Sequence, residues 1–438
     1  MKTIGVGLLG CGTVGTGVAR LLLEQAPLLA ERVGAQIELR RIADIDVQRD
    51  RGIQLAEGVM TTDALSVVND PNIDIIVEMI GGQTFAKDLI MAALAAGKPV
   101  VTANKALLAA QGNAICRTAD ERGLDLGFEA SVGGCMPIIK SLREAMVGNQ
   151  IRSITGILNG TCNYILSKIT EHGSTFAEAL AEAQAEGFAE ADPTLDVEGH
   201  DTAHKITILA ALAYGMHINL DDVYVEGISR LTPMDIQNAD EFGYRIKLLA
   251  ISKKRGEAIE ARVHPTMIPT DNILANVNGA VNAITVTGDA TGDVMLMGRG
   301  AGMMPTASAV VSDIVDIARN LLSGVPKRIP LLGCQPEHVR SIPVLPIDAL
   351  RTHYYIRIMA ADRPGVLSSV SGILGEHGIS IKSVTQKGRQ TTGPVPVVML
   401  THRAAEAAVK QALKQITRLD VVAEPPMRIR IEDPNGSD

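Results

Sequence analysis

The sequence predicts an α/β protein with a parallel sheet near its start and a small βαββαβ sandwich at its end. In the first third, short apolar runs alternate with helical patterns, as is typical of strands buried between two layers of helices. Residues 327–350 hold four prolines and little helical periodicity, which predicts a linker. The residues after them follow the order strand, helix, strand, strand, helix, strand, which predicts the sandwich.

Length and composition set the broad class. A chain of 438 residues is long enough for about three domains. A hydrophobic content of 46% supports large cores, and a net charge of −8 argues against nucleic acid as the main partner. We find no targeting signal and no run of about 20 apolar residues, so we expect no membrane span. The five cysteines show no CxxC spacing, so we predict free thiols in a reducing compartment and hence a cytoplasmic protein. They are Cys11, Cys116, Cys135, Cys162 and Cys334.

The chain opens with a strand, a glycine-rich turn and a helix. An apolar run at Ile4–Leu9 is followed by Gly10, Gly12 and Gly15 and by a helical pattern over Val14–Leu23. The first glycine suits a tight turn, the second lets a pyrophosphate approach the backbone, and the third lets helix and strand pack closely. Free N–H groups at the helix N-terminus favour the anion. We therefore predict a Rossmann-type dinucleotide-binding domain.

An acid at the end of the second predicted strand affects the choice of cofactor. That strand, "IELRRIAD", ends at Asp44, where a carboxylate typically bonds the ribose 2′-OH and repels a 2′-phosphate. Arg49 and Arg51 follow, and they are able to hold a 2′-phosphate instead. Of these residues we give more weight to Asp44, which favours NAD over NADP. Asp44 lies 29 residues after Gly15, which exceeds the usual spacing of about 20, so we expect a longer first helix.

Two further apolar runs, Ile73–Gly82 and Pro99–Leu108, predict the next buried strands of the sheet. Lys105 follows the second strand at its carboxyl end, which is where the ligands of parallel sheets bind. We therefore treat Lys105 as a candidate site residue, with an ordinary surface lysine as the alternative.

Two turns in the middle of the chain carry candidate ligands. Glu129 and the carbonyl groups of the Val132–Met136 turn offer several oxygens to a hard cation. A tight turn with a buried acid explains the same pattern. The turn at Asn159–Thr161 precedes another helical pattern and is able to donate hydrogen bonds to a substrate, although Asn-Gly is also ordinary turn chemistry.

The segment from Glu190 to Lys205 crowds acids just before a helix. Asp201 and Lys205 are four positions apart, so their carboxylate and ammonium lie on the same face of that helix. Such a pair suits proton transfer at a substrate hydroxyl, but a surface ion pair has the same spacing. His200 and His204 have this spacing too and resemble part of a helical zinc site, which needs a third ligand that the sequence does not fix.

Together these motifs resemble the homoserine dehydrogenase family. The signature A-x3-G-F-A-x2-D-P-x2-D-V-x-G-x-D-x3-K over Ala183–Lys205 matches that family at every position. The stretches "TANK", "EASVGG", "NGTCNYI" and "GRGAGMMPTASAVVSD" match it in the same order, so that the similarity covers about residues 1–325. The resemblance implies NAD(P)-linked interconversion of L-aspartate 4-semialdehyde and L-homoserine, in the biosynthesis of threonine, methionine and isoleucine.

The resemblance also implies roles for particular residues. Lys205 would be the acid–base group, Asp201 its partner at the reacting oxygen, and Lys105 the second lysine of the site. Glu190 would take the α-ammonium of the substrate. The other implied substrate contacts are Asp196 and Thr161.

A sodium ion and a dinucleotide are implied as well. The sodium site, mostly of backbone carbonyls, would comprise Glu129, Val132, Gly134 and Met136. The cofactor site, for NAD or NADP, would comprise Gly10, Gly12, Thr13, Val14, Gly15, Asp44, Thr102, Lys105 and Gly302. Ile45 stands where the family often has an arginine, so a preference for NADP does not follow from the resemblance.

The C-terminal sandwich resembles the ACT domain, which senses small ligands. "DRPGVL" over Asp362–Leu367 matches the loop signature of that family, and Gly365 opens a helix whose N-terminus suits a carboxylate. Gly378, in "HGIS", matches the loop that closes an amino-acid site. We expect L-threonine as a feedback effector that contacts Asp362, Gly365 and Gly378. An assembly module without a ligand is the alternative.

These inferences divide the chain into parts. We expect a dinucleotide-binding domain at 1–133, an α/β catalytic and dimerisation domain at 134–299, and residues 300–325 packed back on the first domain. A linker at 326–350 would lead to the ACT domain at 351–432. We expect a homodimer or homotetramer. Two other functions stay open, a non-catalytic amino-acid sensor on this fold and a dehydrogenase of a related semialdehyde.

Overall fold

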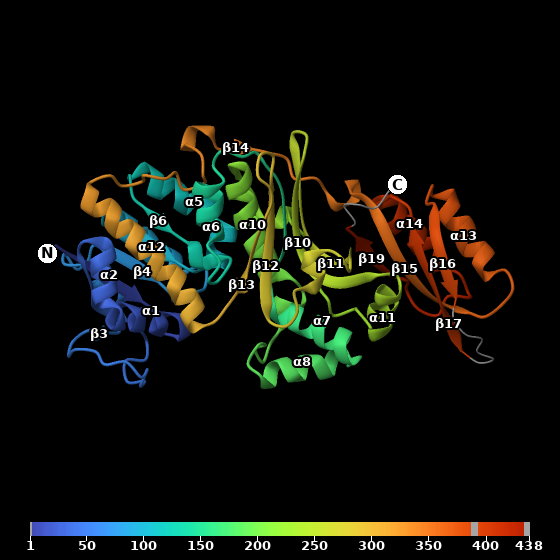
Figure 1. Ribbon diagram of the computed structural model, residues 1–438, viewed down its shortest axis with the longest axis horizontal. Coiled ribbons are helices and arrows are strands. Elements are labelled where there is room, and N and C mark those ends of the chain that lie inside the picture. Colours follow the sequence, from blue (N-terminus) through green and yellow to red (C-terminus); the bar gives the residue numbers. More distant parts are fainter. Residues whose placement is uncertain (1, 387–392, 433–438) are drawn as a thin grey trace.

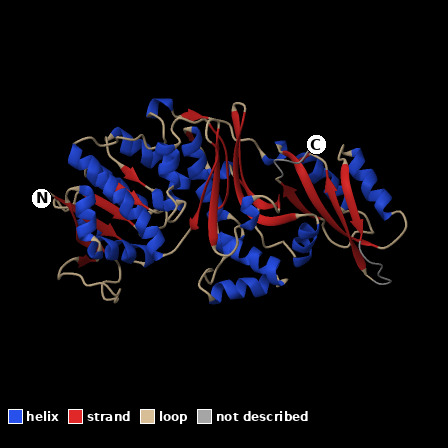
Figure 2. Ribbon diagram, in the orientation of Figure 1, coloured by secondary structure: helices blue, strands red, loops and turns tan. Residues whose placement is uncertain are grey.

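Three units follow one another along an elongated molecule, in the order of the sequence (Figure 1). The computed structural model describes residues 2–386 and 393–432. A six-stranded sheet forms the first unit, and an 11-stranded sheet runs through the other two. Helices accompany the strands in all three units, as Figure 2 shows, and the predicted α/β class is confirmed. In the described part of the chain, no helix is long and apolar enough to cross a membrane.

The N-terminal unit is a Rossmann-type sheet of parallel strands in the order β3-β2-β1-β4-β5-β6. Its strands are β1 (Thr3–Leu9), β2 (Gln36–Ala43), β3 (Met60–Thr61), β4 (Ile75–Glu78), β5 (Val100–Thr102) and β6 (Leu126–Gly127). Its helices are α1 (Thr13–Glu24), α2 (Ala26–Val33), α3 (Ala64–Val68), α4 (Phe85–Ala95) and α5 (Lys105–Glu121). The strand order reverses between β1 and β4, so the ligand crevice of such a sheet lies at the carboxyl ends of these strands.

The first helix is not longer, which corrects the expectation from the position of Asp44. α1 ends at Glu24, and a separate helix, α2, begins at Ala26. Pro27 lies in the first turn of α2. Because proline has no N–H group to donate to the preceding turn, it starts a new helix instead of extending the old one.

The long helix α12 (Met303–Ser323) returns to the N-terminal unit (Figure 1). It lies so close to α1 that a Cβ added at Gly17 would be 2.9 Å from Met303 Cγ. Its apolar face, which includes Val310 and Ile314, belongs to the same hydrophobic core as β1. Segments from distant parts of the chain therefore share one core.

The middle unit combines long antiparallel strands with helices. Its strands are β7 (Ile151–Ile157), β8 (Met216–His217), β9 (Tyr224–Val225), β10 (Tyr244–Arg255), β11 (Ala258–Pro269), β12 (Val281–Gly288) and β13 (Gly292–Arg299). Its helices are α6 (Ile138–Lys140), α7 (Gly160–His172), α8 (Phe176–Ala185), α9 (Thr194–Val197), α10 (His200–Tyr214) and α11 (Pro233–Glu241). Short helical turns lie at Glu129–Ser131, Ser141–Ala145, Leu220–Asp222 and Ile273–Asn276.

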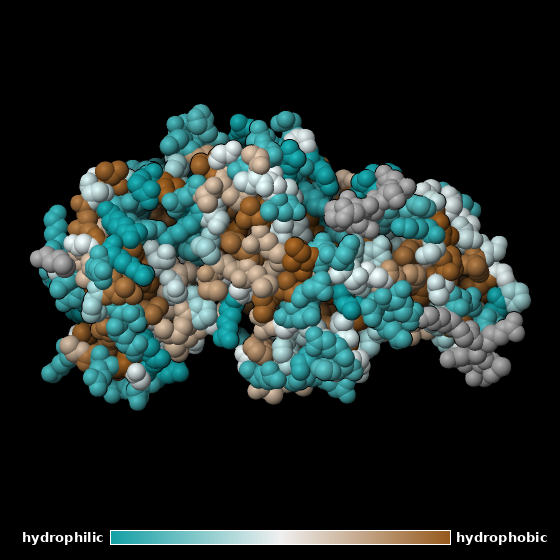
Figure 3. Space-filling view, in the orientation of Figure 1, coloured by the Kyte–Doolittle hydropathy of each residue, from teal (hydrophilic) through white to brown (hydrophobic). Residues whose placement is uncertain are grey.

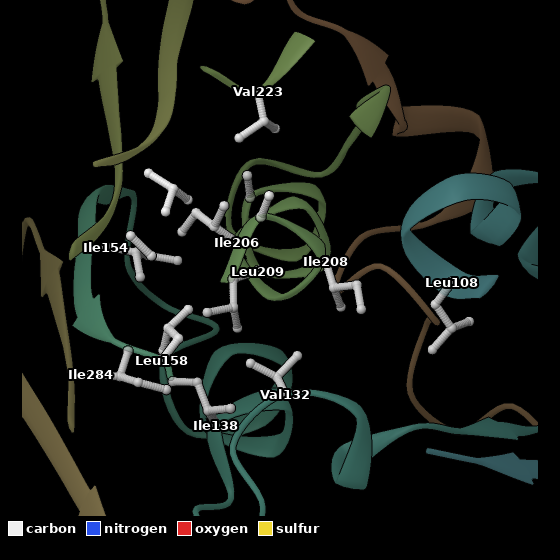
Figure 4. Packing of buried hydrophobic residues seen from close by; sticks show 14 of the residues in the cluster. Leu108, Val132, Ile138, Ile154, Leu158, Ile206, Ile208, Leu209, Val223 and Ile284 are labelled. Atoms are coloured by element: carbon white, nitrogen blue, oxygen red, sulfur yellow. The ribbon is translucent and has the colours of Figure 1, made fainter. Parts of the chain in front are cut away.

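Helix α10 forms the centre of this unit. Figure 4 shows Ile206 and Leu209 of α10 among buried apolar side chains that include Ile154 of β7 and Ile284 of β12. Apolar contacts on several sides fix the helix in position. The ionisable residues in its first turns are therefore fixed with it.

The C-terminal unit has the predicted βαββαβ order. Its elements are β15 (Arg351–Ala361), α13 (Val366–Glu376), β16 (Ile381–Gln386), β17 (Pro394–Thr401), the additional short strand β18 (Ala404–Ala405), α14 (Glu406–Ile416) and β19 (Met427–Ile431). β19 pairs antiparallel with β15 and parallel with β11, where Arg430 lies opposite Thr266. One continuous sheet therefore joins the middle and C-terminal units.

The proline-rich segment before β15 is docked on the middle unit. It contains the short strand β14 (Arg340–Ser341), which pairs with β8, and helical turns at Pro336–His338 and Ile347–Ala349. The Ile259 N–H donates to the Pro343 carbonyl at 2.9 Å. The segment connects the two units along the protein surface and is anchored by backbone hydrogen bonds.

Candidate active site

The candidate active site lies where the parallel sheet meets the middle unit. Lys105 begins α5 just after β5, at the carboxyl edge of the sheet. Asp201 and Lys205 lie in the first turns of α10. One carboxylate contacts both lysines: Asp201 Oδ1 is 3.0 Å from Lys105 Nζ, and Asp201 Oδ2 is 2.8 Å from Lys205 Nζ. Helical spacing predicts the second contact, but only the fold brings Lys105 to the same carboxylate.

The two lysines differ in burial and therefore in acidity. Lys205 is only 6% exposed, and burial lowers its pKa although Asp201 opposes this shift. The Lys105 side chain is 40% exposed, and the Asp201 carboxylate raises its pKa. Burial would raise the pKa of Asp201, but the ammonium groups of Lys205 and Lys105 outweigh it and hold this pKa well below its usual range. Lys205 is thus the lysine that releases a proton more readily.

The Lys205 ammonium is oriented by a second acceptor. It donates to the Leu158 carbonyl at 2.6 Å, and the same carbonyl accepts from Asn282 Nδ2 at 2.9 Å. An ammonium carries three N–H groups. With two of them committed to Asp201 and Leu158, the third is available to a substrate oxygen.

Asn159 organises the acids of the site, a role that the sequence did not reveal. Its Nδ2 donates to Asp196 Oδ1 at 2.6 Å and to Asp201 Oδ2 at 2.9 Å. Its Oδ1 accepts from the Cys162 N–H at 2.8 Å and so caps α7. An Asn-Gly turn before a helix is an ordinary N-cap signal. Only the fold places two carboxylates beside the free end of this amide.

The three residues expected to contact the substrate have different surroundings. Burial raises the pKa of Asp196, although the Asn159 hydrogen bond opposes the shift. Glu190 is exposed and is near enough to Lys105 to contribute to the raised pKa of that lysine. Thr161 is buried, and its hydroxyl donates to the Phe188 carbonyl at 2.6 Å. Two acids therefore flank the lysines, while the Thr161 hydroxyl holds the loop around Phe188.

The glycine-rich turn has the shape that a pyrophosphate requires. Gly10 has a φ of +92°, which L side chains rarely adopt. A Cβ at Gly15 would lie 2.1 Å from the Gly10 carbonyl oxygen. Gly12 is exposed, and a Cβ there would meet nothing within 4 Å. Because α1 begins at Thr13 and Val14 without a side-chain cap, its first N–H groups are open to an anion.

Asp44 is less available to a ribose hydroxyl than its position in the sequence indicates. One of its oxygens accepts from the Cys11 N–H at 2.6 Å, and the other lies 3.2 Å from Arg51 Nη2. The Arg51 guanidinium also donates to three backbone carbonyls. Arg49 is exposed, and Ile45 is 97% exposed. Asp44 therefore lies beside the glycine-rich turn with its charge partly compensated by Arg51.

Other expected cofactor residues lie around the same edge of the sheet. Thr102 is fully buried and its hydroxyl donates to Glu78 Oε2 at 2.7 Å, so this side chain is not free for a cofactor. Gly302 precedes α12 and has a φ of +124°. Glu78, which no motif indicated, accepts from the N–H groups of Ile80 and Gly81 at 2.8 and 2.9 Å. Glu78 thus shapes the loop after β4.

The Glu129 carboxylate caps α6. Its two oxygens accept from the N–H groups of Ile139 and Lys140, each at 2.8 Å. Burial and the neighbouring Asp313 raise the pKa of Glu129 to about 7. Each carboxylate oxygen therefore holds one N–H group at the start of α6, which fixes the Glu129 side chain beside the turn.

The two alternatives for the α10 motif do not agree with the structure. The side chains of Asp201 and Lys205 are 10% and 8% exposed, so they are not a surface ion pair. His200 is exposed and His204 is half-buried. Among residues 2–386 and 393–432, no three or more His, Cys, Asp or Glu side chains are grouped to hold a metal ion.

The residues expected at an effector site lie at opposite ends of α13. Gly365 is the N-cap of this helix, with a φ of +89° and no side-chain cap. Asp362 is exposed in the loop before it, and Gly378 follows the other end with a φ of +67°. A helix of 11 residues spans roughly 16 Å. One free amino acid is too small to contact both ends.

Family models match three consecutive parts of the chain. A model described as homoserine dehydrogenase, NAD binding domain, matches residues 10–129. A model described as homoserine dehydrogenase matches residues 137–315, and an ACT domain model matches residues 354–420. The matched ranges follow the three units of the fold.

Full-length relatives carry the same family name. The homoserine dehydrogenase of Pseudomonas aeruginosa is 47% identical over 438 residues, which are 99% of this chain and 100% of the relative. That of Neisseria gonorrhoeae is 45% identical over 432 residues, which are 99% of both chains. The crystal structure of a homoserine dehydrogenase from Thiobacillus denitrificans superposes with a TM-score of 0.93 at 47% identity and 99% coverage of both chains. The crystal structure of S. aureus homoserine dehydrogenase superposes with a TM-score of 0.77 at 33% identity and also covers 99% of both chains. The chain therefore belongs to the homoserine dehydrogenase family, an oxidoreductase family, and has an NAD-binding domain, a catalytic domain and a C-terminal ACT domain.

Proposed function

We propose that this chain reversibly reduces L-aspartate 4-semialdehyde to L-homoserine and that Lys205 is its acid–base group. The main support is the buried Asp201 carboxylate with one lysine at each oxygen, at the carboxyl edge of the parallel sheet. Burying the Lys205 ammonium and the Asp201 carboxylate is costly unless the pair has a use. A non-catalytic sensor would have no need of the second lysine.

Reduction of an aldehyde requires a hydride, which bound NAD(P)H supplies, and a proton for the oxygen. Lys205 donates this proton, and in the reverse reaction it accepts one. Because its pKa is lowered, Lys205 is able to donate and accept a proton at a pH closer to neutral than an exposed lysine could. Lys105, whose pKa is raised by Asp201, keeps its charge and stabilises the negative charge that develops on the substrate oxygen.

The acids around the lysines give the substrate one orientation. We assign the substrate α-ammonium to Glu190, with Asp196 and Thr161 next to it, because Glu190 is an exposed acid close to Lys105. Asn159 keeps Asp196 and Asp201 at a fixed separation. A related semialdehyde without an α-ammonium would leave Glu190 unpaired and bind less well.

For the cofactor we propose NAD in preference to NADP. The Asp44 carboxylate at the glycine-rich turn disfavours a 2′-phosphate, and Arg51 is engaged by Asp44 and by backbone carbonyls. A hyperthermophilic archaeal homoserine dehydrogenase mutant, 26% identical with a TM-score of 0.62, has been solved in complex with NADPH. Cofactor choice therefore has to be decided by the residues of this chain.

We also propose a sodium ion at the turn after Glu129. The donors would be the carbonyl groups of Glu129, Val132, Gly134 and Met136, and oxygen donors of this kind suit a hard cation. Gly134 has a φ of +59°, and a Cβ there would lie 2.5 Å from the Arg299 carbonyl oxygen. The turn is thus packed tightly against the strand end at Arg299, and a cation bound there would tie the two domains together.

For the ACT domain we propose L-threonine as a feedback inhibitor. The uncapped N-terminus of α13 at Gly365 suits the carboxylate of a free amino acid, and Asp362 suits its ammonium. Since Gly378 lies at the far end of α13, a second ACT domain would have to supply the contacts on that side. The effector would then act by shifting the equilibrium between two arrangements of the paired ACT domains.

This pairing fits our proposal of a homodimer or homotetramer. Figure 3 shows apolar side chains gathered near the middle of one face, over the region of β11 to β13. Met297 of β13 is 64% exposed. Exposed apolar groups of this kind are typical of subunit interfaces.

We propose a cytoplasmic location as well, because all five cysteines are free thiols.

Replacing Lys205 with Ala should lower kcat by about 10²–10⁴, the usual range for loss of an acid–base group. NADH binding, measured by fluorescence titration, should persist. In the wild type, the rate of homoserine oxidation should rise with pH and level off above the Lys205 pKa, which burial places below the ordinary lysine value. The variant should lack this rise. Wild-type turnover in the variant would remove Lys205 from the mechanism.

Replacing Asp44 with Asn should raise the ratio of kcat/KM for NADPH to that for NADH by roughly tenfold, or about 1.4 kcal/mol. The amide keeps an acceptor for the Cys11 N–H and removes the charge that repels a 2′-phosphate. Arg51→Met serves as the control and should shift the ratio toward NADH. A wild-type enzyme that already prefers NADPH by tenfold or more would contradict the role of Asp44.

Sodium should raise both the thermal unfolding midpoint and the activity when compared with choline at fixed ionic strength. Gly134→Ala should lose the response to sodium, because a Cβ at this position displaces the turn. Differential scanning fluorimetry and rate measurements test the two effects separately. Identical midpoints and rates in the two salts would leave the turn as a structural element only.

L-Threonine should inhibit the full-length enzyme, with L-methionine and L-isoleucine as controls. A coupling free energy of about 1–3 kcal/mol corresponds to a change of roughly 5- to 150-fold. Asp362→Asn should raise the threonine concentration needed for half-inhibition. We specify the whole chain because β19 belongs to the catalytic sheet. Inhibition that Asp362→Asn leaves unchanged would place the effector elsewhere, and no response to threonine would limit the ACT domain to assembly.

A further inference from the structure

Glu226, directly after β9, forms a partly buried ion pair across the boundary between the catalytic and ACT domains. Its Oε2 accepts from Arg430 Nη1 at 2.9 Å and lies 3.5 Å from Arg428 Nη2. Both arginines belong to β19, the last strand of the ACT domain. The partner of this catalytic-domain carboxylate therefore lies two hundred residues further along the chain and in another domain.

The ion pair belongs to a network that leaves Arg430 almost no freedom. Arg430 is 1% exposed and also binds Glu406 of α14, at 2.6 Å. The Tyr224 hydroxyl donates to Glu226 Oε2 at 2.8 Å, and its ring lies 4.9 Å from the Arg430 guanidinium. A guanidinium removed from water requires its charge to be paired. The positions of Glu226 and Arg430 are therefore set together.

The backbone reinforces this link. β9 pairs with Arg262 and Val263 of β11, and β19 pairs with Thr266 and Met267 of the same strand. The two short strands therefore follow each other along one edge of β11. Glu226 also donates its own N–H to the Val263 carbonyl at 2.8 Å.

The residues after Glu226 contact the turn between the two acids of the site. The Ile228 N–H donates to the Val197 carbonyl at 2.8 Å. A Cβ at Gly227 would lie 2.4 Å from that carbonyl oxygen and 2.5 Å from Glu198 Cα. The turn at 197–199 directly follows Asp196 and leads into α10 with Asp201. The loop at 226–228 therefore supports this turn without space for a side chain.

We propose that Glu226 is a positioning residue for the reaction, which sets the substrate-binding turn through the loop at 226–228. The inference rests on the proposed function, because it assumes that the acids beside the turn bind the substrate. Glu226 itself touches no reacting atom. It transmits the position of β19 to the turn, so that the ACT domain contributes to substrate binding even when no effector is present.

The test compares two carboxylate-to-amide changes at the same domain boundary. Glu226→Gln should raise KM for L-homoserine by roughly tenfold, because the acids beside the turn move away from the position that binds the substrate. KM for the dinucleotide should not change. Gly227→Ala, which forces the loop away from the Val197 carbonyl, should likewise raise KM for L-homoserine and leave KM for the dinucleotide unchanged.

The matched control is Asp235→Asn. Asp235 of α11 is fully buried and pairs with Arg357 of β15 at 2.7 Å, so it also joins the catalytic and ACT domains. This change should lower the thermal unfolding midpoint and leave KM for L-homoserine near the wild-type value. Unchanged KM for L-homoserine in Glu226→Gln, or an equal rise in Asp235→Asn, would overturn the positioning role. Wild-type protein without homoserine oxidation would instead overturn the proposed function.

Discussion

The candidate site depends on one buried carboxylate, that of Asp201, because it is shared by groups from separate parts of the chain. It contacts Lys105 of the parallel-sheet unit, Lys205 of its own helix and the Asn159 amide after β7. A carboxylate removed from water is stable only if charges and hydrogen bonds replace the water. The sheet, the turn after β7 and α10 must therefore keep their relative positions, and the same requirement that stabilises the domain interface also builds the reaction centre.

The ACT domain is held by a comparable constraint. Its last strand lies within the catalytic sheet, and Arg357 and Arg430 pair with the catalytic-domain carboxylates of Asp235 and Glu226. Removing the domain would leave these acids without their cations. Shared strands and ion pairs therefore join the ACT domain to the catalytic domain. The proline-rich segment at 327–350 supports this view, since it is anchored by hydrogen bonds to β11 and to the end of α10.

Several residues show how far sequence reasoning extends at the site. The pairing of Asp201 with Lys205 follows from helical spacing, because a helix brings i and i+4 together whatever surrounds it. The turn at Gly10 and the close approach of α1 at Gly15 follow from what only glycine permits. The contact of Asn159 with two carboxylates and the role of Glu78 were missed, because their local patterns are those of ordinary turns. Arg51 was considered as a phosphate ligand, but the fold commits it to Asp44 and to backbone carbonyls.

By itself, the sequence determined the parallel sheet, the βαββαβ order, the glycine-rich turn and the resemblance that names the family. Each of these depends on residues close together in the chain, whose spacing sets the local structure. Only the tertiary structure decided that Lys105 meets Asp201, that α12 packs on α1 and that β19 completes the catalytic sheet. These contacts join segments that are far apart in sequence. Their geometry depends on how all the buried surfaces and charges are satisfied at once, which no local pattern specifies.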